Sequence, residues 1–180
     1  MKARRARIAD VPAIHRLIAH YAAQDLLLPR SEVDIRTHIA RFLVLEEESR
    51  GQGGETGIIG CVALEPYGSD LAEIRSLAVD PEIRGRGLGA CLVQSALAKA
   101  RRRQIARVFA VTHVPEFFGR QGFTTSPRWA LPEKIARDCC TCPKARTCNL
   151  VAVVATVCPE RVVLPGSARL IPAIKPAPAV

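Results

Sequence analysis

A glycine-rich turn in the middle of the chain carries residues suited to binding a phosphate. Arg84, Gly87 and Gly89 form the pattern R-x-x-G-x-G, between a stretch typical of a strand and one typical of a helix. Glycine lets several successive N–H groups point into one concavity and lets a phosphate approach the backbone closely. The N-terminus of the helix would add a partial positive charge. The turn therefore predicts a pyrophosphate site, although glycines at this spacing also form ordinary loops.

A cluster of cysteines near the C-terminal end is the second group that could do chemistry. Cys139, Cys142 and Cys148 form a C-x-x-C pair followed by a third thiol. Structural zinc takes four thiolate or imidazole ligands, for which C-x-x-C is a favourable half-site. The fourth ligand would have to be Cys140, Cys158 or His113. A structural zinc is therefore one expectation, and a set of reduced, partly buried thiols is the alternative.

Alternating strand and helix patterns surround the glycine-rich turn. They predict a strand over 71–79, the longest helix over 87–103, a strand over 107–111 and a short helix over 115–121, which Gly122 ends. Upstream they predict a strand over 5–8, helices capped by Asp10 and Ser31, and a hairpin of strands over 42–46 and 58–64. A β-branched stretch predicts a last strand over 149–157. The fold class is therefore mixed α/β.

The predicted strand over 71–79 leads toward the turn. Regular alternation places one set of side chains, Ala72, Ile74, Ser76 and Ala78, on one face. The other set, Glu73, Arg75, Leu77 and Val79, would share the opposite face. Two charged side chains are thus expected on the same strand face as Leu77 and Val79.

Length and composition indicate one domain that folds in water. The 180 residues are 48% hydrophobic and 24% charged, and no apolar run is long enough to cross a bilayer. The basic N-terminus does not lead into an apolar signal core, so a cytoplasmic location is expected. The net charge of +9 comes from scattered Lys and Arg residues, and aromatic residues are only 4%. These features favour an anionic small-molecule ligand over nucleic acid or a membrane.

Domain boundaries follow from where the patterns end. Residues 1–158 are expected to form the domain, with 139–148 as a cysteine-rich insertion. Prolines recur through 159–180 without helical or strand periodicity, which predicts a flexible tail. Seven cysteines, an odd number, without a secretory signal argue against a disulfide framework. The sequence leaves open whether the protein forms a homodimer.

Two elements of the sequence resemble the GNAT superfamily of N-acetyltransferases. The stretch from Leu77 through Ala90 is similar to the superfamily's strand, Q/R-x-x-G-x-G/A turn and long helix. The stretch from Phe117 through Phe123 is similar to its aromatic-x-x-x-G-F element after the next strand. The resemblance covers roughly residues 4–157. It implies a mostly antiparallel, twisted central sheet, flanked by helices, whose splayed parallel strands bind acetyl-CoA.

The resemblance also implies which residues contact acetyl-CoA. Main-chain groups of Leu77, Ala78 and Val79 would hold the acyl group and the pantetheine arm, which lies like an added strand. The amides of the turn would hold the pyrophosphate, and Arg86 would either add a charge-assisted contact or face solvent. The turn residues are Arg84, Gly85, Arg86, Gly87, Leu88, Gly89 and Ala90. Phe117 and Phe118 are expected to line the same site.

Acyl transfer from a thioester to an amine needs a neutral amine, a stabilised oxyanion and a proton for the leaving thiolate. Glu73 resembles the Glu that some superfamily members use as a general base, and a salt bridge to Arg75 is its alternative role. The oxyanion donor would be the N–H of Leu77 or Val79. Phe118 stands where many members carry a proton-donating Tyr. Thr112 or His113 would therefore supply the proton, or water would.

Several phrases further resemble short bacterial amino-acid N-acetyltransferases of the N-acetylglutamate synthase type, which acetylate L-glutamate in the first step of arginine biosynthesis. These phrases span 26–31, 70–79, 114–118 and 131–134. The two carboxylates of glutamate require at least two cations, preferably Arg. The candidate substrate-binding residues are Arg30, Arg75, Ser76, Lys134 and Arg137. The alternatives are acetylation of another amino acid, a small amine or a protein N-terminus, and a non-catalytic acyl-CoA-binding module.

Overall fold

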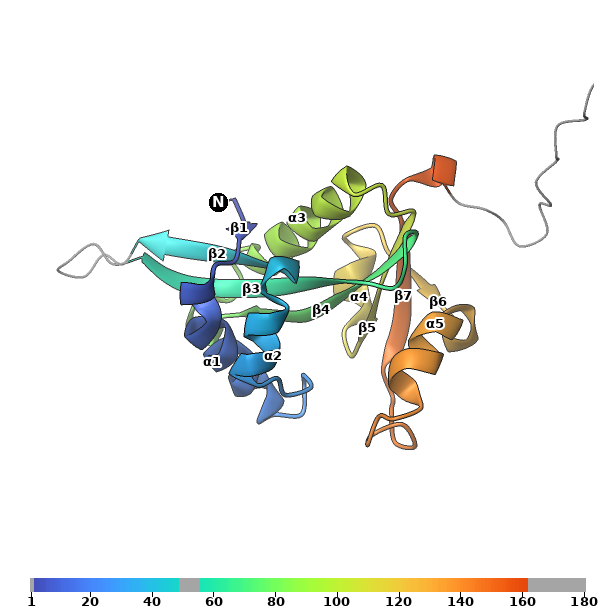
Figure 1. Cartoon of the computed structure of the whole chain (residues 1–180), viewed down its shortest axis with the longest axis horizontal. Coiled ribbons are helices and arrows are strands. Elements are labelled where there is room, and N and C mark those ends of the chain that lie inside the picture. The colour runs from blue at the N-terminus through green and yellow to red at the C-terminus, as the bar shows by residue number, and fades with distance from the viewer. Residues whose placement is uncertain (1, 49–55, 162–180) are drawn as a thin grey trace, which may run out of the picture.

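The computed structural model describes residues 2–48 and 56–161 (Figure 1). Most of the loop between the predicted hairpin strands 42–46 and 58–64, and most of the tail predicted over 159–180, fall outside these residues. Within the described ranges, no helix is both long and apolar enough to span a bilayer.

A single sheet runs through the described residues in the order β1-β2-β3-β4-β5-β7-β6. All neighbouring strands are antiparallel except β4 and β5, which are parallel. The strands are β1 (Arg4–Arg5), β2 (Phe42–Glu48), β3 (Thr56–Pro66), β4 (Leu71–Val79), β5 (Arg107–Thr112), β6 (Thr124–Ser126) and β7 (Val151–Thr156). This is the mixed, mostly antiparallel sheet that the sequence predicts.

Helices cover both faces of the sheet. Figure 1 shows α1 (Val11–Ala22) and α2 (Glu32–Thr37) on one face and α3 (Leu88–Arg102) on the other. Beyond β5 follow α4 (Pro115–Gly119) and α5 (Pro132–Lys134), which continues as a π-helical turn over Ile135–Cys139. Short 3-10 turns complete the path: Ile8–Asp10, Ile39–Arg41, Pro81–Ile83, Arg128–Ala130 and Pro159–Arg161.

Each face of the sheet has its own hydrophobic core. On the α3 face, Leu92 and Leu97 pack with Val62, Leu64 and other apolar strand residues. On the α1 face, the apolar stripe of α1 packs against Cys61, Ala63 and their neighbours. The buried residues of α1, which are Val11, Ile14, Leu17 and Ile18, have the spacing of one face of an amphipathic helix.

Most predicted elements are confirmed, and the differences have local causes. Ser31 caps α2 as predicted, because its side chain accepts from the N–H of Asp34. Asp10 stands at the N-cap position of α1 as predicted, but its side chain makes no bond to the N–H groups of the helix. The Asp10 carboxylate instead accepts from the Arg4 side chain and the Arg7 N–H, which ties β1 to the 3-10 turn before α1. The sequence analysis missed β6 and α5, whose three-residue lengths are too short to show a period.

The predicted alternation along β4 fails in the middle of the strand. Cys61 pairs with Ala78 and Ala63 pairs with Arg75, so β4 carries one extra residue between these pairs. Ser76 lies there with a positive φ of 49°. An extra residue of this kind is a β-bulge, which reverses the facing of every later side chain.

The bulge therefore corrects the predicted strand faces. Ala72 and Ile74 pack in the α3-side core, and Leu77 and Val79 pack against the same core. Ala78 belongs to the α1-side core instead. Since Glu73 and Arg75 alternate with Ala72 and Ile74, they face away from Leu77 and Val79, not with them.

The parallel strands β4 and β5 separate soon after they meet. Their pairs are limited to Leu71–Arg107, Ala72–Val108 and Glu73–Phe109. Beyond Glu73, β5 continues to pair with β7 up to Thr112, while β4 stays with β3 up to Val79. The two strands are therefore splayed over the half of β4 that carries the bulge, as the sequence predicts.

Lys99 is an ionisable side chain in the α3-side interior. It is only 4% exposed and donates from Nζ to the main-chain oxygens of Ala40 (2.8 Å) and Arg41 (3.0 Å). Burial, together with the nearby charges of Arg103, Arg5 and Arg102, lowers its pKa to about 8. Lys99 thus ties α3 to the 3-10 turn before β2 at the expense of a buried charge.

This buried charge makes stability depend on pH. Between about pH 8 and 10.5 the unfolded chain holds more protons on Lys99 than the folded protein, so the unfolding free energy should rise with pH. Across that pH range, the unfolding free energy of the native protein should rise by roughly 2 to 3 kcal/mol more than that of the Lys99→Met variant. Urea unfolding of both proteins at pH 7.5 and pH 10 measures the difference, in which the titration of other groups cancels. A difference that does not change with pH would contradict the account.

Candidate functional site

The glycine-rich turn has the backbone shape that the sequence predicts. Gly85 and Gly87 have positive φ values of 83° and 73°, and α3 begins directly afterward at Leu88. Residues with side chains adopt this conformation at a cost, which explains the glycines. The first N–H groups of α3 have no acceptor within the helix, so they can serve an anion.

Gly89 allows α4 to approach the first turn of α3. A Cβ atom at position 89 would lie 3.3 Å from the ring of Phe117. Phe117 is partly buried against the α3-side core, whereas Phe118 is buried within it, edge-on to Phe117 and Phe123. The two predicted site phenylalanines are thus different: Phe117 lies beside the turn, and Phe118 is a core residue.

The two arginines of the turn have partners in the free protein. Arg84 donates to the Tyr21 hydroxyl at 2.9 and 3.1 Å and lies over its ring. Tyr21 in turn donates to the main-chain oxygen of Val79, which joins α1, the end of β4 and the turn. Arg86 is exposed and pairs with Glu47 at 2.7 Å. Both arginines thus have partners of their own beside the turn.

Glu73 lies at the centre of a buried charged network. Its carboxylate is 2% exposed and accepts from Arg75 Nε (2.5 Å), the Tyr67 hydroxyl (2.8 Å) and Lys134 Nζ (2.9 Å). The predicted salt bridge between Glu73 and Arg75 is therefore present. Burial lowers the pKa of Lys134, and the Glu73 charge opposes that effect.

Arg137 and Asp138 complete this network from the π-helical turn. Asp138 accepts from Lys134 (2.7 Å), the Tyr67 hydroxyl (2.6 Å) and Arg137 Nε (3.1 Å), and it pairs with Arg75. The Arg137 guanidinium lies 3.5 Å from the centre of the Tyr67 ring. We call this group the charged cluster: Tyr67, Glu73, Arg75, Lys134, Arg137 and Asp138.

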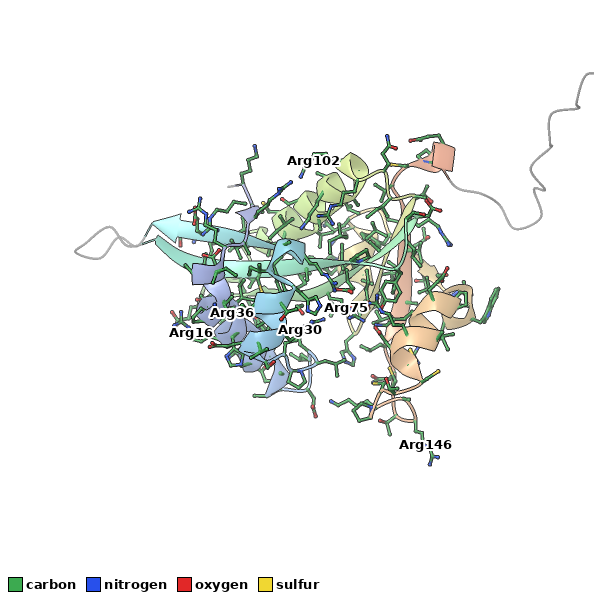
Figure 2. All side chains as sticks on the ribbon, viewed as in Figure 1. Arg16, Arg30, Arg36, Arg75, Arg102 and Arg146 are labelled. Carbon is green, nitrogen blue, oxygen red and sulfur yellow. The ribbon has the colours of Figure 1, made fainter. Side chains whose placement is uncertain are left out.

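The structure thus brings three of the predicted substrate-binding cations together and separates the fourth. Arg75, Lys134 and Arg137 meet around Tyr67. Arg30 pairs with Asp34 on α2 instead. The arginines labelled in Figure 2 lie on different elements, and Arg75 is drawn between the α1–α2 pair and the α5 segment. The sequence analysis missed Tyr67 and Asp138, although Asp138 lies four residues after Lys134, on the same side of a helical turn.

The remaining predicted residues lie at the edges of this region. Ser76 forms the bulge and is buried. Thr112 is buried at the end of β5 and its hydroxyl accepts from the N–H of Val114, while His113 is exposed. Neither residue belongs to the charged cluster.

The cysteine cluster does not have the arrangement of a zinc site. Among the described residues, no three His, Cys, Asp or Glu side chains are grouped closely enough to hold a metal. Cys148 instead lies 2.5 Å from an Arg128 nitrogen, and the Cys140 thiol donates to the main chain at Ile135. The prediction of zinc at Cys139, Cys142 and Cys148 is not supported, because these side chains are not grouped as metal ligands in the described part of the chain. The alternative of reduced thiols agrees with the structure, in which all described cysteines are free.

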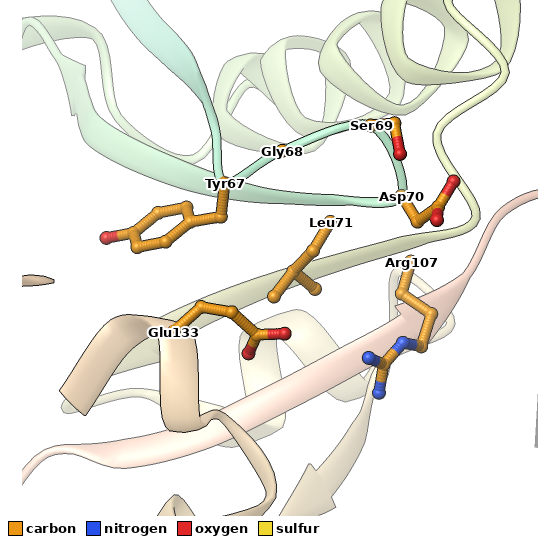
Figure 3. A pocket seen from close by; sticks show the side chains of 7 residues that line it. All are labelled: Tyr67, Gly68, Ser69, Asp70, Leu71, Arg107 and Glu133. Atoms are coloured by element: carbon orange, nitrogen blue, oxygen red, sulfur yellow. The ribbon is translucent and has the colours of Figure 1, made fainter. Parts of the chain in front are cut away.

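A separate cavity of about 320 Å³ opens at the turn between β3 and β4. Figure 3 shows Tyr67 and Glu133 on one side of the cavity and Arg107 on the other, with Leu71 between them. It lies at the opposite end of β4 from the glycine-rich turn. Tyr67 lines the cavity and belongs to the charged cluster, whereas the glycine-rich turn lies beyond the other end of β4, so the cavity and the turn are separate features.

Known proteins similar to this chain belong to one family. The family model described as the Acetyltransferase (GNAT) family matches residues 12–123. An uncharacterized N-acetyltransferase of Chlorobaculum tepidum is 40% identical over 154 residues, which are 86% of this chain and 95% of the relative. An amino-acid acetyltransferase of Mycobacterium tuberculosis is 43% identical over 67% of each chain.

The solved structures include an N-acetylglutamate synthase of Neisseria gonorrhoeae in complex with coenzyme A and N-acetyl-glutamate. It has a TM-score of 0.75 and 31% identity, over 87% of this chain and 35% of the synthase. This chain therefore spans about a third of the synthase. A Mycobacterium tuberculosis protein in complex with CoA has a TM-score of 0.71 and 31% identity, over 87% of this chain and 99% of that protein.

Replacing Gly87 should weaken binding of coenzyme A. The turn is exposed, so Gly87→Ala can relax to a negative φ in the free protein, and the ligand must then restore the bound shape. We expect the dissociation constant of coenzyme A, measured by calorimetry, to rise about five- to thirty-fold. Gly119→Ala is the matched control, since position 119 has open space and no positive φ. Equal affinity of the two variants would exclude the turn from the binding site.

Proposed function

The chain belongs to the GNAT acetyltransferase family, and we propose that it transfers the acetyl group of acetyl-CoA to the α-amine of L-glutamate. The product would be N-acetylglutamate, and the reaction the first step of arginine biosynthesis. The observation that carries the proposal is the meeting of Arg75, Lys134 and Arg137 around Tyr67, beside the place where β4 and β5 separate. The relatives named as amino-acid acetyltransferases support the substrate class.

The acetyl-CoA site proposed here follows the splay of β4 and β5. The N–H groups at the start of α3 and the turn glycines would hold the pyrophosphate. Main-chain groups of Leu77, Ala78 and Val79 would pair with the pantetheine arm, because β5 does not pair with this half of β4. Phe117 would pack beside the turn, at the contact that Gly89 makes possible.

The acceptor would approach from the other face of the sheet. Leu77 and Val79 pack on the α3 side, while Glu73 and Arg75 face the opposite side. An arm that enters at the turn and lies in the gap between the strands would present its thioester to the charged cluster. Coenzyme and acceptor would thus meet from opposite faces, which keeps their anionic groups apart.

The residues of the charged cluster would orient the amino acid for direct attack on the thioester. The substrate carboxylates would bind the cations, and the α-amine would point toward Glu73, which we propose as its proton acceptor. The N–H of Leu77 or Val79 would stabilise the oxyanion. Thr112 and His113 stay candidates for the thiolate proton, with water as the other source. Buried Phe118 has no proton to donate, an observation that keeps a non-catalytic acyl-CoA-binding module as the second candidate.

A thiol-release assay with acetyl-CoA and a panel of amino acids tests the function. Turnover with L-glutamate above all others is the expected result. Turnover of an amine without a second carboxylate, at a higher specificity constant, would contradict the glutamate assignment. Coenzyme A binding without thiol release from any amino acid would support the non-catalytic module.

Removing Arg75 should impair use of the acceptor and spare the coenzyme. Arg75→Ala removes a guanidinium that makes charged hydrogen bonds, each worth about 1.5 to 3 kcal/mol. The KM for glutamate should rise about 10- to 100-fold, while the affinity for coenzyme A stays unchanged. Arg102→Ala, at the exposed end of α3, is the control. An unchanged KM in Arg75→Ala would remove this arginine from the acceptor site.

A further inference from the structure

The Asp138 carboxylate has more cationic partners than a surface aspartate needs. Lys134 Nζ lies 2.7 Å from it, Arg137 Nε lies 3.1 Å from it, and Arg75 pairs with it as well. These are the three cations that the proposed function assigns to the acceptor's carboxylates. The protein's own carboxylate thus occupies the centre of the proposed substrate site.

Asp138 also shares its partners with Glu73. Arg75 and Lys134 each bind both carboxylates, and the Tyr67 hydroxyl lies 2.8 Å from Glu73 and 2.6 Å from Asp138. Tyr67 has one proton and also accepts from Arg75, so it can donate to only one of the two carboxylates. Two like charges therefore lie at one hydroxyl, and only one of them can accept its proton.

Their positions decide which carboxylate can leave. Glu73 is buried in β4, in the middle of the sheet. Asp138 comes from the one-turn π-helix Ile135–Cys139 at the edge of the molecule, and its side chain is 24% exposed. A small movement of this short turn would carry Asp138 into water, whereas Glu73 could leave only if the sheet opened.

We infer that in the free protein Asp138 occupies the place of the acceptor's side-chain carboxylate, and that a dicarboxylic amino acid displaces it on binding. This inference rests on the proposed function and adds a determinant of specificity to it. The exchange conserves charge, since one carboxylate replaces another between Arg75, Lys134 and Arg137. An amino acid without a second carboxylate would offer Arg75 and Lys134 no replacement for Asp138, so Asp138 stays in place. Arg137 pairs with Glu65 as well.

Removing the Asp138 charge should therefore favour the ligand. Asp138→Asn keeps the size of the side chain but removes its charge, so it binds the cations more weakly. A smaller fraction of the protein then has residue 138 in the place of the substrate carboxylate. Glutarate, which has two carboxylates and no amine, is the probe, in the presence of saturating coenzyme A. By calorimetry we expect the full-length variant to bind glutarate about ten-fold more tightly than the native protein, with a parallel decrease in the KM for glutamate.

Asp25→Asn is the matched control. Asp25 is an exposed carboxylate that pairs with Lys144 of the cysteine-rich segment at 2.6 Å, outside the charged cluster. Its loss changes the net charge by the same amount. Unchanged or weaker glutarate binding by Asp138→Asn would overturn the inference, and so would equal tightening in both variants.

A measurement on the native protein does not depend on whether a variant folds. If the ligand displaces Asp138, glutarate should increase hydrogen–deuterium exchange in peptides covering 132–142, while acetyl-CoA alone should not. Slower exchange there with glutarate would show that Asp138 stays in place and would overturn the inference. Turnover of glutamate with unchanged glutarate affinity in Asp138→Asn would refute the inference alone. Native protein that neither binds glutarate nor acetylates a dicarboxylic amino acid would refute both proposals.

Discussion

The β-bulge at Ser76 reverses, in the middle of β4, the sheet face to which the side chains of this strand point. Before the bulge, Glu73 and Arg75 point to the α1 side of the sheet. After it, Leu77 and Val79 pack on the α3 side, where the glycine-rich turn begins α3. The bulge lies where β4 and β5 separate, so this stretch of backbone has no β5 partner, and the side chains of Glu73 and Arg75 lie on the sheet face opposite Leu77 and Val79. The proposed coenzyme site and acceptor site both depend on this geometry.

The charged cluster shows what a buried set of ions requires in such a place. Each charge taken from water needs partners, and here two cations bridge two carboxylates around one tyrosine. Arg75 and Lys134 pair with the protein's own Asp138 and Glu73, and Arg137 pairs with Asp138 and Glu65. A site that binds an anionic substrate needs another partner for its cations when the substrate is absent, because unpaired buried charges would destabilise the fold.

The sequence predicted the parts of the fold that depend on local patterns. The bounds of β4, the length of α3, the Ser31 cap and the glycine turn all follow from periodicity and backbone preference. The bulge could not be foreseen, because a one-residue insertion leaves the apolar pattern of β4 almost unchanged while reversing its faces. Tyr67 and Asp138 were missed for a different reason: 71 residues separate them in sequence, and only the docking of the π-helical turn on the β3–β4 end brings them together.

The central claim is that the bulge assigns coenzyme and acceptor to opposite faces of β4. Amide chemical shifts of the full-length protein, titrated separately with coenzyme A and with L-glutamate, test it directly. Coenzyme A should shift the amides of 77–79 and 85–90, whereas glutamate should shift those of 73–75 and 134–138. Coenzyme A shifts confined to the cavity at the β3–β4 turn, or the same residues responding to both ligands, would contradict the claim.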